Sequence, residues 1–368
     1  MQLEAPFQNI YKNKKVFITG HTGFKGSWLT QWLLNLGAEV AGYSLYIPSE
    51  PSLYEILDLN SKIKNYKDDI RNFDSLLHTI KEFNPDIIFH LAAQPIVMQS
   101  YLDPKNNFDV NVMGMVNILE AIRVCKSIQA AVLITSDKCY ENVEWEYGYR
   151  ETDRLGGKDP YSASKACAEI VFSSYARSFF QDHETYLATA RAGNVIGGGD
   201  WAADRIIPDA MRAWSKGLSL KIRNPHATRP WQHVLEPLSG YLMLGAKLLT
   251  KTSHLHGESF NFGPPQEANH SVEYLLNILE EKWKSLPTKI ENKNNTLGEA
   301  SLLKLCCDKA LNRLKWKPNL SFEETLVFTN DWYLNYYNNQ ETDYTKQTIK
   351  QIEEYTRLAL QRNLTWAI

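Results

Sequence analysis

The 368-residue sequence predicts an α/β fold, a doubly wound parallel sheet followed by a smaller, mixed C-terminal lobe. Short apolar runs alternate with helical patterns up to about residue 190, which is typical of parallel sheets with helices on both faces. After Arg191 the alternation breaks and the elements become shorter. We therefore expect a first domain over residues 13–192, a second lobe over 193–340 from which some strands return to the core, and a helical tail over 341–368.

A glycine-rich turn follows the first predicted strand, residues 15–19. Its spacing is Gly20-x-x-Gly23-x-x-Gly26, and a helical apolar pattern begins at Ser27. Glycine lets the backbone approach a pyrophosphate, and the free N–H groups of a helix N-terminus bind the anion. Strand, glycine loop and helix in this order predict a Rossmann-type dinucleotide site, which a glycine triplet alone would not.

The second predicted strand, residues 39–45, leaves the choice of cofactor open. NAD enzymes often place an acid at its end for the adenosine ribose, whereas this chain has no acid before Glu50. No arginine suited to a 2′-phosphate appears there either, although Lys25 of the glycine loop could contact one. The residues therefore leave open both NAD and NADP.

The third and fourth predicted strands end in further candidates. Asp69 follows the third strand, residues 64–66, where it could meet an adenine amine or cap the next helix. The fourth strand carries His90, which we interpret as a packed strand residue, and ends in Leu91-Ala92-Ala93, whose small side chains would let a cofactor lie against the backbone. Asn111, inside a long helical pattern over residues 105–126, is interpreted as a core hydrogen-bonding group or as the holder of a water molecule.

Several chemically active side chains gather after the fifth predicted strand, residues 130–134. Thr135-Ser136-Asp137-Lys138 follows directly, at the carboxyl edge where open α/β sheets bind ligands. Tyr161 and Lys165 lie one helical turn apart in the next helix, residues 161–180, and therefore face the same way. An acid, two amines, a hydroxyl and a phenol around one crevice suggest proton transfers on a sugar-like substrate.

Composition excludes several classes of function. A net charge of −2 gives no reason to expect nucleic-acid or membrane-surface binding. The N-terminal residues lack the apolar core of a signal peptide and no apolar run reaches membrane-spanning length, so we expect a cytoplasmic protein. Five cysteines do not form a disulfide framework, and Cys306-Cys307 lacks a second pair at zinc-ligand spacing, so we expect reduced packing residues and no metal site.

Four arginines stand near polar and aromatic residues at or beyond the end of the first domain: Arg191, Arg205, Arg223 and Arg229. Guanidinium forks suit a diphosphate, and an aromatic face suits a nucleobase. Each arginine alone is better explained by a surface ion pair. Grouped opposite a dinucleotide-binding lobe, they favour a nucleotide-linked substrate.

From residue 13 to 337, the chain resembles the extended short-chain dehydrogenases/reductases that act on nucleotide sugars. The matching motifs are the glycine loop, Asp69-Ile70-Arg71, Leu91-Ala92-Ala93, Asn111, Ser136, Tyr161-x-x-x-Lys165 and Arg191-Ala192-Gly193-Asn194. The stretches GHTGFKGSWL, TSDKCYEN, GGKDPYSASK and RAGNVIGGGDW are most similar to the subfamily that acts on CDP-glucose. Relatives acting on dTDP-glucose or GDP-mannose typically have Asp-Glu where this chain has Asp137-Lys138.

This resemblance implies an NAD-dependent lyase that dehydrates CDP-D-glucose to CDP-4-dehydro-6-deoxy-D-glucose, for deoxysugar and lipopolysaccharide O-antigen biosynthesis. The cofactor-binding residues it implies are Gly20, Gly23, Phe24, Lys25, Gly26, Asp69, Ile70, Leu91, Ala92, Ala93, Asn111, Tyr161 and Lys165. The substrate-binding residues it implies are Gln94, Asn194, Arg205, Arg223 and Arg229. It also implies a homodimer formed by the helices that begin near residues 105 and 161.

The resemblance further implies a role for each catalytic residue. Tyr161, its pKa lowered by Lys165 and the positive nicotinamide ring, would remove the 4-hydroxyl proton while hydride leaves C4, and Ser136 would bind the 4-oxygen. Asp137, kept protonated, would donate to the departing C6 oxygen. Lys138 stands where relatives have the glutamate base for C5. It is either a neutral base, a charged stabiliser of the enolate, or a structural partner of Asp137.

Two other functions are consistent with parts of the pattern. A nucleotide-sugar 4-epimerase or 4-ketoreductase also needs Tyr161 and Lys165, but not an acid pair that eliminates water. The pair Asp137-Lys138 therefore argues against it. A non-catalytic nicotinamide-binding sensor would not need Ser136, Tyr161 and Lys165 together.

Overall fold

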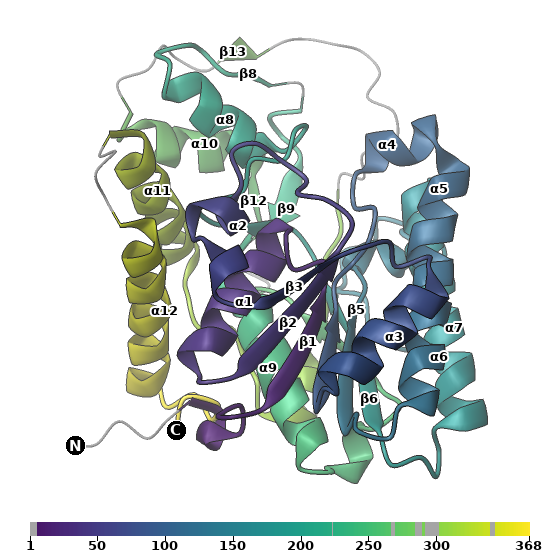
Figure 1. The fold of residues 1–368 in the computed structure, drawn as a ribbon. Coiled ribbons are helices and arrows are strands. Elements are labelled where there is room, and N and C mark those ends of the chain that lie inside the picture. Colours follow the sequence, from purple (N-terminus) through teal and green to yellow (C-terminus); the bar gives the residue numbers. More distant parts are fainter. Residues whose placement is uncertain (1–5, 223, 266–268, 284–288, 291–301, 339–342) are drawn as a thin grey trace.

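The computed structural model describes residues 6–222, 224–265, 269–283, 289–290, 302–338 and 343–368. At its centre is a seven-stranded sheet in the order β11-β6-β5-β4-β1-β2-β3, in which every neighbouring pair is parallel (Figure 1). Its strands are β1 (Lys15–Thr19), β2 (Glu39–Ser44), β3 (Lys64–Lys67), β4 (Ile87–His90), β5 (Ala130–Ile134), β6 (Tyr186–Ala192) and β11 (Ser259–Phe262). The predicted doubly wound sheet is confirmed.

Helices cover both faces of this sheet (Figure 1). One face packs against α3 (Phe73–Phe83), α6 (Gly114–Val124) and α7 (Pro160–Phe179). The other packs against α1 (Phe24–Asn35) and α9 (Leu235–Leu249), with α12 (Tyr344–Gln361) beyond α1. Successive strand residues alternate between the two cores, so that Val16 and Ile18 join one and Phe17 the other. Burial on both faces explains why the strands are continuous apolar runs.

The smaller elements lie mainly beyond the carboxyl ends of the strands (Figure 1). Three two-stranded sheets pair β7 (Val195–Ile196) with β10 (Gln232–His233), β9 (Thr228–Pro230) with β12 (Asn269–Ser271), and β8 (Lys221–Ile222) with β13 (Lys289–Ile290). The helices near them are α2 (Leu53–Ile56), α4 (Val97–Leu102), α8 (Ile206–Trp214), α10 (Val272–Glu280) and α11 (Phe322–Asn338). Two elements of the 193–340 segment return to the core instead: β11 joins the central sheet beside β6, and α9 packs on a face of that sheet.

The helical pattern over residues 105–126 is interrupted in the structure. It forms α5 (Pro104–Phe108), a π-helical turn η3 (Asp109–Met113) and α6. Such turns are rare and often mark functional sites. The tail is helical as predicted, in α12. Within the described ranges, no helix combines the length and apolarity needed to cross a membrane.

Candidate active site

The glycine loop has the close packing that a phosphate cradle requires. Gly20 has φ +76°, and a Cβ there would lie 2.7 Å from the backbone nitrogen of Ala92. A Cβ on Gly26 would lie 2.2 Å from the carbonyl oxygen of Gly20. Gly23 caps α1 without any side-chain hydrogen bond, so a bound anion has no capping side chain to displace. The residues present therefore fit a dinucleotide phosphate.

Lys25, in the first turn of α1, interacts electrostatically with the catalytic residues. Burial and the charge of Arg205 lower its pKa to about 8, while Asp137 opposes this shift and Lys165 adds to it. A contact of Lys25 with a ribose 2′-phosphate stays a prediction.

The adenosine end of the cleft offers mostly polar groups that already have partners. Asp69 accepts two hydrogen bonds of 3.0 Å from Nε of Arg71, and these lower the pKa of Asp69. At the end of β2, the hydroxyl of Ser44 lies 2.9 Å from Nδ1 of His21. Ile70 is buried against the small residue Gly114 of α6. Nothing at this end distinguishes NAD from NADP.

The segment Thr135–Tyr140, which we call the catalytic turn, connects β5 to the loop before α7. The hydroxyl of Ser136 donates to Oδ1 of Asp137 at 2.9 Å and accepts from the N–H of Lys138 at 3.2 Å. Asp137 is buried, and Lys138 is half-buried. A Cβ on residue 193 would lie 2.9 Å from Oδ2 of Asp137, so glycine at this position lets the end of β6 approach the carboxyl group.

Tyr161 and Lys165 lie in the first two turns of α7, whose N-terminus is capped by Asp159. Burial raises the pKa of Tyr161 to about 12, against a hydrogen bond with Ser136 that lowers it. Burial lowers the pKa of Lys165 to about 8, against the charge of Glu169 that raises it. We expected Lys165 to lower the pKa of Tyr161; in the protein alone, burial dominates and keeps the phenol protonated at neutral pH.

Gln94, Asn107 and Asn111 form a buried amide cluster beside α7. Asn111, in the π-helical turn, accepts from the N–H of Gln94 at 2.8 Å and donates to the hydroxyl of Ser164 at 2.9 Å. The side-chain oxygen of Gln94 accepts from Asn107 at 2.8 Å. These hydrogen bonds match the interpretation of Asn111 as a core hydrogen-bonding group.

The residues after β4 continue the strand. Leu91 and Ala92 form hydrogen bonds with Thr19, and Ala93 is half-buried after them.

The three of the four arginines that the structure describes have different partners. Arg191 is buried in an ion pair with Glu169, 2.6 Å apart, so the suggestion that it holds a diphosphate is wrong. Arg205 pairs with Asp200 at 2.9 Å, and its charge reaches Tyr161. Arg229 is half-buried on β9. Arg223 lies outside the described residues, and Asn194 is half-buried between β6 and β7.

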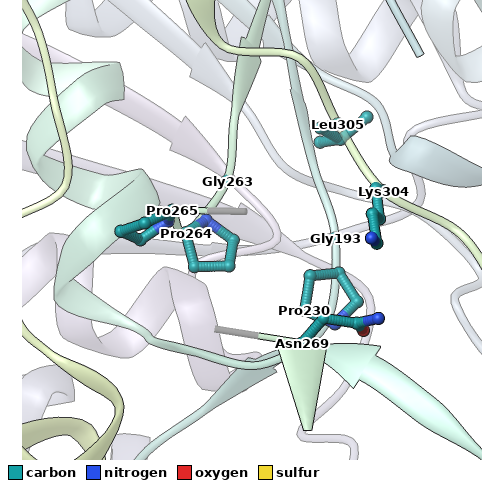
Figure 2. Close-up of a pocket in the computed structure, with 8 residues that line it drawn as sticks. All are labelled: Gly193, Pro230, Gly263, Pro264, Pro265, Asn269, Lys304 and Leu305. Carbon is teal, nitrogen blue, oxygen red and sulfur yellow. The ribbon is translucent and has the colours of Figure 1, made fainter. Parts of the chain in front are cut away.

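A small pocket adjoins the catalytic turn through Gly193 (Figure 2). Its lining residues are Gly193, Pro230, Gly263, Pro264, Pro265, Asn269, Lys304 and Leu305. Asn269 and Lys304 supply its polar side chains, and our sequence reasoning named neither. Pocket walls made of glycine and proline carry no chemical signal in a sequence, so tertiary structure was needed to find this pocket.

Two further side chains complete the surroundings of the catalytic residues. His90 is a buried strand residue, as expected, and its Nδ1 lies 2.7 Å from the hydroxyl of Thr19. Burial, with a smaller effect of Lys165, lowers its pKa to about 3.

Glu169 was missed by our sequence reasoning, although its position four residues after Lys165 placed it on the same helix face. All five cysteines are free thiols.

The geometry agrees with comparisons to known proteins. The family model described as GDP-mannose 4,6 dehydratase matches residues 17–328. A CDP-glucose 4,6-dehydratase of Salmonella typhimurium is 47% identical over 89% of this chain and 92% of its own length. Among the solved structures that share the fold is a UDP-glucose 4-epimerase of Thermus thermophilus in complex with NAD, with a TM-score of 0.74 and 24% identity over 87% of this chain and 98% of that one. Another is a dTDP-glucose 4,6-dehydratase of Bacillus anthracis in complex with NAD, with a TM-score of 0.73 and 21% identity over 90% of this chain and 99% of that one.

Proposed function

The chain belongs to the GDP-mannose 4,6-dehydratase family, and from this premise we propose that it converts CDP-D-glucose to CDP-4-dehydro-6-deoxy-D-glucose with bound NAD. The observation that carries the proposal is the catalytic turn, in which Ser136 and Asp137 interact with Tyr161 of α7 and Lys138 follows directly. A 4-epimerase needs the tyrosine and the serine but no proton donor for a departing C6 oxygen. The 47% identical relative favours CDP-glucose among nucleotide sugars.

The glycine loop with the start of α1, the backbone after β4 and Lys165 would hold the cofactor. Bound NAD supplies an acceptor for the hydride of C4 and, once reduced, the hydride that returns to C6. The temporary ketone makes C5–H acidic, so water can leave across C5–C6. Because oxidation and reduction cancel, the protein needs no external reductant.

Tyr161 and Ser136 act on the 4-oxygen. Tyr161 takes the hydroxyl proton, and Ser136 holds the oxygen by a hydrogen bond. Burial keeps the phenol protonated in the protein alone, with a pKa of about 12. The positive charges of Lys165 and of the nicotinamide ring therefore have to lower this pKa before Tyr161 acts as a base.

Asp137 and Lys138 act at C6 and C5. Asp137, buried between Ser136 and Gly193, is assigned as the acid that protonates the departing C6 oxygen. Lys138, the next residue, is assigned as the base for C5. Lys138 is half-buried, so its side chain is not fully enclosed by the protein.

The direct test incubates the purified protein with CDP-glucose and NAD, without a reductant. We expect a 4-keto-6-deoxy product, identified by mass and by NMR, with no net change in the reduced cofactor. A 4-epimer would instead identify an epimerase, and an unchanged substrate with tight cofactor binding would identify a sensor. Parallel assays with dTDP-glucose, UDP-glucose and GDP-mannose test the nucleobase, and NADP in place of NAD tests the cofactor.

Lys138→Met tests the assignment of the base. We expect normal NAD binding, oxidation at C4 and then arrest, so reduced cofactor should accumulate while product formation falls at least about a hundredfold. Tyr161→Phe is the control, because it should block oxidation and form no reduced cofactor. Normal turnover of Lys138→Met would remove Lys138 from the mechanism.

We also propose a cytoplasmic homodimer that works in deoxysugar biosynthesis for surface polysaccharide. Five free cysteines suit a reducing compartment. Met113, Ile170 and Phe179, on or next to α6 and α7, are large apolar side chains about half exposed, which suits helices that pair with a second copy. Light scattering on the wild type and on Ile170→Asp would test the dimer, which the substitution should weaken.

A further inference from the structure

Glu169 of α7 and Arg191 of β6 form an ion pair beneath the catalytic turn. Nη2 of Arg191 lies 2.6 Å from Oε2 of Glu169, and both side chains are at least 97% buried. The carboxylate also accepts hydrogen bonds from the hydroxyls of Thr135, Thr189 and Ser259. One guanidinium and three hydroxyls therefore surround it. Both oxygens of this buried carboxylate are bonded, so its movement would leave buried groups unpaired, although Nε of Arg191 itself has no hydrogen-bond partner among the described residues.

This ion pair holds the catalytic turn at both ends. The hydroxyl of Thr135, the first residue of the turn, donates to Oε1 of Glu169. The hydroxyl of Tyr140, the last residue, accepts from Nη1 of Arg191 at 2.8 Å, and the guanidinium lies 5.0 Å from the centre of the Tyr140 ring. Ser136, Asp137 and Lys138 lie between these two attachments, so their backbone depends on the pair.

Tyr140 has a second attachment that strengthens the far end. Its hydroxyl donates to the side-chain oxygen of Asn261 on β11 at 2.8 Å. Nη1 of Arg191 also donates to the carbonyl of Glu151, and the N–H of Asn261 donates to the carboxyl of Glu151 at 2.8 Å. The end of the turn is thus joined to β6, to β11 and to the loop that leads into α7.

Glu169 lies one helical turn after Lys165 in α7, so the ion pair connects the catalytic turn with Lys165. Lys165 interacts electrostatically with Glu169 on its own helix, with Cys139 of the turn, with His90 of β4 and with Lys25 of the glycine loop. Glu169 is the acid among these groups. Movement of Glu169 would therefore disturb both the turn and the charge around Lys165.

We propose that the Glu169–Arg191 pair is the positioning unit of this active site, which holds the catalytic turn at both ends so that Ser136, Asp137 and Lys138 face Tyr161. The pair touches neither substrate nor cofactor in this role. Its effect on turnover rests on the proposed function, whereas its effect on the rigidity of the turn does not.

Two threonines provide a matched test. Thr135 and Thr189 are both buried, and each donates one hydroxyl hydrogen bond to Glu169, but Thr189 lies on β6, outside the turn. Thr135→Val and Thr189→Val each remove one such bond at nearly constant volume. Hydrogen–deuterium exchange of the segment 135–140 should rise several-fold in Thr135→Val and remain at the wild-type level in Thr189→Val. Tyr140→Phe should raise exchange at the other end of the segment.

Kinetics give the second measurement. In Thr135→Val we expect kcat for dehydration to fall about tenfold with KM nearly unchanged, since misplaced catalytic groups slow chemistry more than binding. Thr189→Val should keep the wild-type kcat. Equal exchange and equal kcat in the two valine variants would overturn the proposal. A wild type that does not dehydrate CDP-glucose would overturn the proposed function instead, and the exchange comparison would still decide whether the pair holds the turn.

Discussion

Glu169 and Glu236 are both enclosed glutamates, but only Glu169 forms an ion pair among the described residues, whereas Glu236 feels the charge of Arg362 as a minor effect. Glu169 lies against Arg191, and although burial raises its pKa, Arg191 and the hydroxyls of Thr135 and Thr189 lower it below the ordinary value. Glu236, at the start of α9, accepts from the backbone N–H groups of Asn319 and Leu320 and from the hydroxyl of Tyr355. There burial dominates and raises the pKa to about 7.

This difference separates two uses of a buried carboxyl group. Neutral donors satisfy the oxygens of Glu236, and the charge of Arg362 does not outweigh burial, so the group joins α9 to the C-terminal α12 at a pH-dependent cost. Arg191 compensates the charge of Glu169, so this site keeps its ionised form and its geometry at physiological pH. Glu169, whose charge is compensated by Arg191, lies at the catalytic turn, whereas Glu236, whose charge is not, joins α9 to α12.

Removing the cation from the first site should have the largest effect. Arg191→Met leaves Glu169 buried without its counter-charge, and we expect a loss of about 3–5 kcal/mol in the free energy of unfolding. Urea denaturation at pH 7.5 measures it. The double variant Glu169→Gln/Arg191→Met, which removes both charges, should regain most of the stability but not the activity. Wild-type stability of Arg191→Met would show that the compensation is unimportant.

The second prediction concerns the sign of pH dependence. The pKa of Glu236 is about 7 in the folded protein against an ordinary 4.5, so the folded state binds the proton more tightly and its stability falls as pH rises between these values. Glu236→Gln removes this dependence. Relative to that variant, the wild type should lose about 3 kcal/mol between pH 4.5 and 7, measured by urea denaturation at several pH values.

Glu169→Gln is the contrasting control for this prediction. The folded-state pKa of Glu169 is lowered, so the stability it contributes is present above its ordinary pKa and is lost as pH falls through the lowered value. The two variants should therefore deviate from the wild type with opposite pH trends. A pH-independent difference between the wild type and Glu236→Gln would contradict the assigned pKa.

Local patterns predicted part of this structure from the sequence, whereas burial and contacts between distant segments could not be predicted. The strands, the glycine loop and the Tyr161-Lys165 spacing follow from local patterns, and the structure has them where expected. Arg191 was misassigned because a guanidinium suits a diphosphate and a carboxylate equally well, and burial alone decides between them. The π-helical turn at Asn111 and the pocket beside Asp137 depend on contacts between distant segments, which carry no local signal.

The smallest expected effect comes from one hydroxyl at the uncompensated site. Tyr355 donates to Oε2 of Glu236 at 3.0 Å, and this hydrogen bond lowers the pKa of Glu236. Tyr355→Phe should cost about 1 kcal/mol of unfolding free energy at pH 8 and less at pH 5, because the bond is stronger to the ionised carboxylate than to the neutral acid. Tyr333→Phe is the matched control: its buried hydroxyl bonds the backbone of Asp200, so its cost should not change with pH in this way. If both variants lose equal stability at both pH values, the hydroxyl of Tyr355 does not act through the charge of Glu236, and burial and the backbone hydrogen bonds set that pKa.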